Sequence, residues 1–145
     1  MMASATVLYT PEVLALATSL AAHRLDDTLP LSAEARSRSC GSTLAMGLAL
    51  DDEGRVARLG LRSQACAIGQ ASAAIFAQAA EGRSAADILL VADSVEQWLV
   101  AEGPLPEWPG FDVIAPARAY PGRHGAILLP WNAARQILRD LAPSS

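Results

Sequence analysis

Residues 39–68 read SCGSTLAMGLALDDEGRVARLGLRSQACAI, and this stretch decides the fold of the chain. From residue 43 to residue 50 the larger apolar side chains fall on alternate positions, which is the period of a half-buried strand. A polar turn that ends in glycine follows at residues 51–54, and a second alternating run occupies residues 55–64. The stretch therefore predicts a β-hairpin.

The register of this hairpin follows from its apolar faces. If Leu50 pairs with Arg55 across the turn, the apolar faces of the two strands coincide. Extended to the open end of the hairpin, the same register sets Cys40 opposite Ala65, next to Cys66. Residues directly opposite each other in an antiparallel pair have Cβ atoms about 4.5–5.5 Å apart. We therefore expect the two cysteines of the chain to lie together at the open end.

Length and charge exclude several classes of protein. A chain of 145 residues is long enough for one hydrophobic core, so we expect a single domain over residues 1–145. Its 11 basic residues are scattered arginines and its net charge is -4, so no basic stripe indicates nucleic-acid binding. Two cysteines are too few for the disulfide framework of a small secreted protein. The apolar run at residues 13–22 is shorter than the roughly 18 residues that a membrane span needs, so we expect a cytoplasmic protein.

Helices are expected on either side of the hairpin in the sequence. Caps, apolar periodicity and glycine stops predict helices at residues 11–24, 66–80, 85–92, 95–102 and 127–141. A short strand over residues 34–39 is expected to lead the chain to Cys40. Residues 103–110 are expected to form a loop with Trp108 against the body, and residues 111–123 show only a turn at 120–122. This order predicts an α+β domain, with a small antiparallel sheet of about three strands covered on one side by helices.

The cysteines and one histidine form a candidate metal site. Cys66 lies where the hairpin is followed by a helix, and the positive end of a helix favours the thiolate. Cys40 supplies a second thiolate, and His124 lies in a turn from which its side chain can reach a shared site. Two thiolates and an imidazole suit a soft metal, one ligand short of a closed tetrahedral site. A free cysteine is also often a small buried apolar residue, so spacing alone leaves both interpretations open.

From Cys40 to Gly82 the sequence resembles the U-type iron-sulfur cluster assembly scaffolds, the IscU-type or NifU-like family. In that family a Cys-Gly-Asp precedes a hairpin, a Gly-Cys-Ala-Ile-Ser type sequence opens the next helix, and that helix ends in Gly-Lys/Arg-Ser/Thr. This chain has CGS at 40–42, ACAIG at 65–69 and GRS at 82–84. The resemblance covers roughly residues 35–140 and implies the IscU-like α+β scaffold fold.

The resemblance also implies a ligand set. The implied ligands are Cys40, Cys66, His124 and, as a weak fourth in place of the family aspartate, Ser42. The third family cysteine, commonly the one that accepts sulfur from a cysteine desulfurase, falls on Gly125 or, with a shift of one residue, on Ala126. The implied cofactor is a zinc or iron ion or a labile iron-sulfur cluster.

The function implied by the resemblance is that of an iron-sulfur cluster assembly scaffold, a metal-binding protein and not an enzyme. Its implied partners are a cysteine desulfurase and iron-sulfur acceptor proteins, with the chain as a monomer or a homodimer. One alternative is a sulfur-transfer protein that carries persulfide on Cys66, with Cys40 resolving it. Another is a ligand-free interaction module on the same fold, in which the cysteines are buried or joined as a disulfide.

Overall fold

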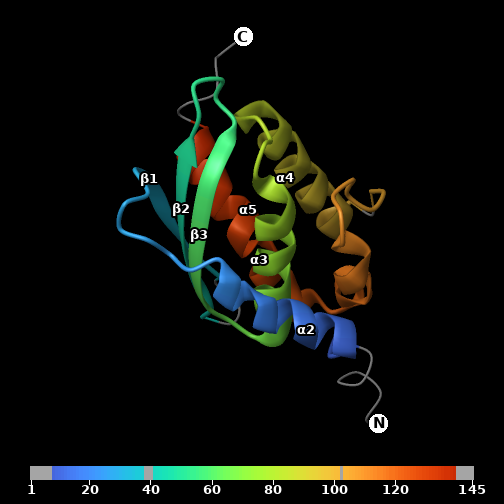
Figure 1. Ribbon diagram of the computed structural model, residues 1–145. Helices are drawn as coiled ribbons and strands as arrows, with labels where there is room; N and C mark the ends of the chain where they lie inside the picture. Colours follow the sequence, from blue (N-terminus) through green and yellow to red (C-terminus); the bar gives the residue numbers. More distant parts are fainter. Residues whose placement is uncertain (1–7, 38–40, 102, 140–145) are drawn as a thin grey trace.

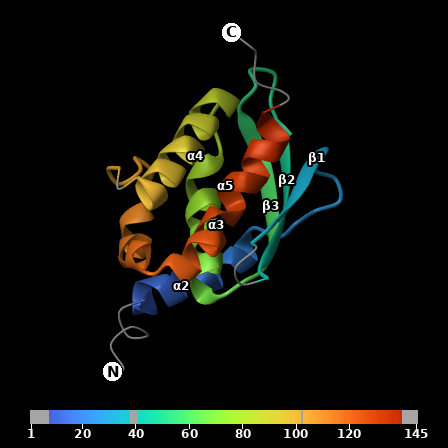
Figure 2. The same cartoon turned by 180° about the vertical axis from the view of Figure 1, so that it is seen from behind.

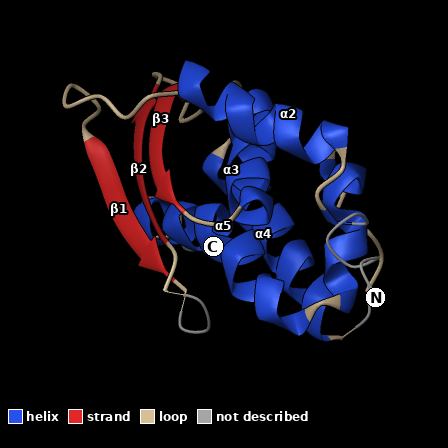
Figure 3. Ribbon diagram, turned by 90° about the horizontal axis from the view of Figure 1, so that it is seen from below, coloured by secondary structure: helices blue, strands red, loops and turns tan. Residues whose placement is uncertain are grey.

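The structure is a computed structural model that describes residues 8–37, 41–101 and 103–139. Its sheet consists of β1 (Leu31–Arg36), β2 (Thr43–Leu50) and β3 (Val56–Gln64), antiparallel and in the order β1-β2-β3. Helices cover one face of this sheet, as the view from below shows (Figure 3). The predicted α+β class and three-stranded antiparallel sheet are confirmed.

The helices form two layers behind the sheet. The α-helices are α2 (Pro11–Ser19), α3 (Ala67–Ala80), α4 (Ala85–Val100) and α5 (His124–Leu138), and the 3-10 helices are η1 (Leu20–Ala22), η2 (Phe111–Ala119) and η3 (Pro121–Arg123). Helices α3 and α5 pack against each other and against the strands, with α4 beyond them (Figures 1 and 2). Helix α2 crosses α3 at the end of the molecule where β3 passes into α3 (Figure 1).

The core lies between the sheet and the inner helices. Leu44, Met46 and Leu48 of β2 are at most 1% exposed, as their alternation predicts. The helices supply an aromatic cluster, in which the ring of Trp131 lies 5.2 Å from that of Phe76. Among the described helices, none is both long and apolar enough to cross a membrane.

The predicted hairpin register is wrong by two residues. Leu48 pairs with Leu59 where the predicted register sets Ala57. One residue of the shift arises at the turn, where Asp51 stands opposite Arg55: the Asp51 amide donates to the Arg55 carbonyl (2.8 Å). The other arises at a β-bulge beside Leu50, where Ala57 is the extra residue. Beyond the bulge the shift is even, so residues 58–64 keep their predicted faces. Before the bulge it is one residue, so Val56 is buried on the core face in place of the predicted Ala57, which is exposed.

The Asp51 side chain holds this turn together. Its Oδ1 accepts hydrogen bonds from the Arg55 amide (3.0 Å) and the Glu53 amide (2.9 Å). These two bonds, that from Arg55 first, hold the pKa of the exposed Asp51 carboxyl below its ordinary value. Gly54 closes the turn with a φ of 77°, a left-handed conformation that glycine adopts without strain.

Three other predicted elements differ in extent. Residues 85–92 and 95–102 form one helix, α4, because its apolar stripe runs unbroken past Ser94 and no glycine or proline interrupts it. Its start is as predicted, with the Ser84 hydroxyl accepting from the Asp87 amide (3.1 Å). Strand β1 begins at Leu31, three residues earlier than expected, and α5 begins at His124, so Pro130 lies in its second turn.

The connector between α2 and β1 runs along the β3 edge of the sheet and covers part of the sheet face that points away from the helices. The His23 carbonyl accepts from the Leu61 amide (2.7 Å), so the connector pairs with the edge of β3. Glycine is required at Gly60, because a Cβ there would overlap the carbonyl oxygen of Arg24. The helices therefore pack on one face of the sheet, and the connector packs on part of the other face.

Candidate metal site

Cys66 is the N-cap of α3, directly after β3. Its backbone is extended, with φ -65° and ψ 170°, and its carbonyl accepts the first helical bond, from the Gln70 amide (2.9 Å). Its side chain makes no capping hydrogen bond, and the residue is partly exposed. The thiol therefore stands at the positive end of a helix of 14 residues, as the sequence predicts, and is accessible to an incoming ligand.

His124 is the first residue of α5 and is partly buried. Its Nε2 lies 2.7 Å from the carbonyl oxygen of Arg118. A carbonyl only accepts, so Nε2 must carry the hydrogen, which leaves Nδ1 of the neutral ring with its lone pair. A metal-binding histidine is usually held in this way, with its second ring nitrogen donating to a carbonyl or carboxylate. His124 is thus in a tautomer that can bind a metal through Nδ1.

The first turns of α3 and α5 touch each other. A Cβ added at Gly69 would lie 2.8 Å from the Cβ of Ala65 and 3.1 Å from that of Ala126. One turn further along, the buried Ser72 hydroxyl donates to the Ile127 carbonyl (2.7 Å). The small residues allow this close approach. The start of α5 therefore lies against the start of α3, in the same part of the molecule as Cys66.

Cys40 lies outside the described residues, so its predicted position beside Cys66 stays a prediction. The residues around it belong to the loop between β1 and β2, in which the Ser37 amide donates to the Ser42 carbonyl (2.8 Å). Ser42 is buried, with 6% exposure. Thr43 pairs with Gln64, so this loop joins the sheet at the end from which α3 departs.

A metal site made of the described residues alone is incomplete. Within residues 8–37, 41–101 and 103–139, no three His, Cys, Asp or Glu side chains lie close enough together to hold a metal ion. The donor types nevertheless suit zinc or iron, with Cys66 as a thiolate and His124 as an imidazole. A third donor must come from outside this set, and Cys40 is the candidate from the chain itself.

The hydrogen bond that orients the His124 ring was not predicted from the sequence. The group that orients its ring is a main-chain carbonyl, which any residue at position 118 would offer. That carbonyl belongs to η2, a 3-10 helix for which the sequence pattern gave no indication. No residue-type signal could have identified it.

The fold of this chain is similar to the folds of solved structures from other organisms. No protein-family model and no curated protein matches the chain. Among solved structures it is similar to the N-terminal part of a NifU-like protein from Brucella abortus, with a TM-score of 0.81, 29% sequence identity and coverage of 93% of this chain and 94% of that one. It has the fold of a protein from Fervidobacterium islandicum described as an iron-sulfur cluster assembly scaffold for the SUF system, with a TM-score of 0.75, 20% identity and coverage of 93% and 98%. A hypothetical protein matches with a TM-score of 0.64, 20% identity and coverage of 88% and 96%.

Proposed function

We propose that this chain, which belongs by its structure to the U-type iron-sulfur cluster scaffold family, binds a zinc or iron ion or a labile cluster through Cys40, Cys66 and His124. The proposal rests on one observation above all. A partly exposed thiol and a histidine held in a metal-binding tautomer stand at the starts of two helices whose first turns touch. In this function the chain is a carrier for a metal or cluster and not an enzyme.

Each proposed ligand has its own chemical role. Cys66 would bind as the thiolate, which is the form that binds a soft metal. His124 offers Nδ1, and Cys40 offers the second thiolate. Ser42 is a weak fourth ligand, because a hydroxyl binds zinc or iron less strongly than the carboxylate for which it stands in. Structural zinc sites are closed by four strong ligands, so a site with three keeps one position open for exchange. An exchangeable cargo is what a delivery protein requires.

Two residues, Gly125 and Ala126, are candidates for the position of the third family cysteine. Ala126 is fully buried and packs against Gly69, whereas Gly125 is partly exposed, so Gly125 is the better match for the lost thiol. Neither residue can accept sulfur. Sulfur from a cysteine desulfurase would have to reach Cys66 or Cys40, or the chain would receive a preformed cluster and pass it to an acceptor protein in the cytoplasm.

The test is the iron, sulfide and zinc content of the chain after anaerobic purification and reconstitution. Wild type should hold iron with sulfide, or zinc, and Cys66→Ser and Cys40→Ser should hold none, because each removes a strong ligand. His124→Ala should bind the metal at least about 10- to 100-fold more weakly, because that range is typical for loss of an outer-shell partner and a direct ligand contributes more. His23→Ala is the matched control, since His23 is the other histidine of the sequence. It should leave the metal content unchanged.

Two results would contradict this function. One is wild-type protein that stays free of metal after reconstitution, and the other is Cys66→Ser protein with undiminished metal. Metal-free protein that accepts one sulfur atom on Cys66 from a desulfurase, and loses this ability on alkylation, would favour the sulfur-transfer alternative. Its support is the partly exposed thiol at the positive end of α3.

A further inference from the structure

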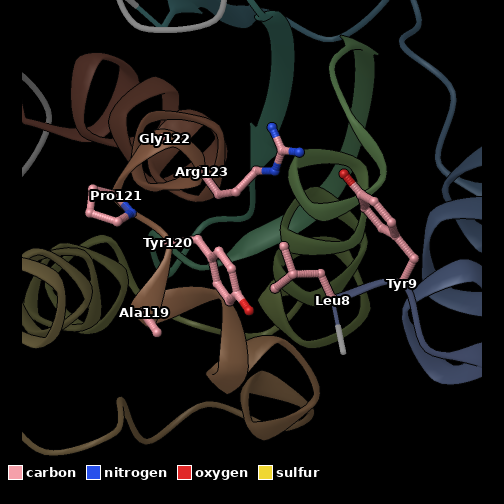
Figure 4. A pocket seen from close by; sticks show the side chains of 7 residues that line it. All are labelled: Leu8, Tyr9, Ala119, Tyr120, Pro121, Gly122 and Arg123. Carbon is pink, nitrogen blue, oxygen red and sulfur yellow. The ribbon is translucent and has the colours of Figure 1, made fainter. Parts of the chain in front are cut away.

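A pocket with apolar walls and one cationic side chain lies apart from the proposed ligands. Its volume is about 320 Å³, and it is lined by the residues just before α2 and by the junction of η2 with η3 (Figure 4). Leu8, Pro121 and the rings of Tyr9 and Tyr120 form its apolar surface. Neither Cys66 nor His124 lines it, and the Nε2 of His124 is bonded to Arg118.

The cationic side chain is Arg123, and its Nε is buried without a hydrogen-bond partner among the described residues. Two other arginines form ion pairs with acidic side chains. Arg83 bonds to Asp87 at 3.1 Å, and Arg135 bonds to Asp93 at 2.7 Å. Buried polar atoms in native proteins are nearly always hydrogen-bonded, so an unpaired buried N–H indicates a missing partner. A guanidinium only donates, so a ligand acceptor would pair with the terminal nitrogens of Arg123, because the Nε itself has almost no accessible surface.

Charge and shape indicate which acceptor this is. The chain carries a net charge of -4, yet none of the described residues that line the pocket is acidic. In Figure 4 the Arg123 guanidinium and the Tyr9 hydroxyl extend toward the same edge of the pocket, and Leu8 lies between the two tyrosine rings. A guanidinium presents its N–H groups as a planar fork that matches the two oxygens of a carboxylate.

We propose that this pocket binds a small organic acid. Its carboxylate pairs with Arg123 and Tyr9, and its apolar body packs on Leu8, Pro121 and the ring of Tyr120. Ligand pockets measure roughly 300–1,000 Å³. At about 320 Å³ this pocket is at the small end of that range, so it takes an acid with one ring or a short aliphatic body. The site does not require the metal.

The experiment is a calorimetric titration of the full chain with three probes. Benzoate carries both the charge and an apolar body, benzamide is its neutral counterpart, and acetate carries the charge with almost no body. Benzoate should bind more tightly than acetate, and benzamide should show no binding. Arg123→Gln should weaken benzoate binding about tenfold or more, and Arg123→Lys should weaken it less, because lysine keeps the charge but loses the fork.

Two further variants serve as controls. Arg62→Gln removes an exposed arginine of β3 that does not line the pocket, and should leave benzoate affinity unchanged. Cys66→Ser should also leave it unchanged, which separates this site from the proposed metal site and from anion binding to a metal. The proposal is overturned by wild type that does not bind benzoate, by equal binding of benzamide, by folded Arg123→Gln with wild-type affinity, or by loss of binding in Cys66→Ser.

Discussion

Replacement of Trp131 by alanine is expected to lower the free energy of unfolding by about 3–5 kcal/mol. Trp131 is fully buried at the centre of the aromatic cluster. Its ring lies 5.0 Å from that of Trp108 and 6.1 Å from that of Phe111, both in the segment after α4. Alanine would leave a cavity where α5 meets this segment. The measurement is urea unfolding followed by circular dichroism.

Trp131→Phe is the matched control for this prediction. The Trp131 Nε1 is buried and has no hydrogen-bond partner among the described residues, so the indole carries an unsatisfied N–H. Phenylalanine removes that group and keeps most of the aromatic contact, so its cost should be well below that of alanine. Equal losses in the two variants would mean that ring packing at this position contributes little.

Replacement of Gly60 by alanine is expected to destabilise the protein by about 3 kcal/mol or more. A Cβ at this position would overlap the carbonyl oxygen of Arg24 and come within 2.9 Å of the Leu25 Cα. Both obstacles are main-chain atoms, which no rotamer change can move aside. The connector would have to leave the edge of β3 and lose the bond between the Leu61 amide and the His23 carbonyl.

Gly122→Ala provides the comparison for Gly60→Ala. A Cβ at Gly122 meets no atom within 4 Å, so this substitution should leave the melting temperature almost unchanged. Thermal unfolding of the two variants side by side measures the difference. A Gly60→Ala protein as stable as Gly122→Ala would contradict the close packing of the connector on the sheet.

The local patterns of the sequence predicted the fold well. Alternation of apolar residues identified β2 and its buried face, and Cys66 was correctly expected where β3 is followed by α3. The register was missed because it depends on the Asp51 turn and on the bulge at Ala57, and neither changes the alternation pattern. Since side chains alternate with a period of two residues, the even error beyond the bulge left the faces of residues 58–64 as predicted, whereas the bulge put Val56 on the core face instead of Ala57.

The site was less predictable than the fold, because its parts come from distant segments. The contact of Gly69 with Ala126 joins residues far apart in the sequence, and small residues give no pairing signal. The pocket at Arg123 depends on η2 and η3, where the sequence showed only a turn. The resemblance of motifs implied which residues are ligands. Residue spacing alone could not show that the Arg118 carbonyl orients the His124 ring.

The most direct test of the proposed metal site is X-ray absorption at the zinc edge of the zinc-loaded protein. We expect two sulfur neighbours at about 2.3 Å and an imidazole nitrogen at about 2.0–2.1 Å in the wild type, and no zinc retained by Cys66→Ser. A zinc shell of oxygen and nitrogen alone, unchanged in Cys66→Ser, would contradict the assignment of Cys40 and Cys66 as ligands.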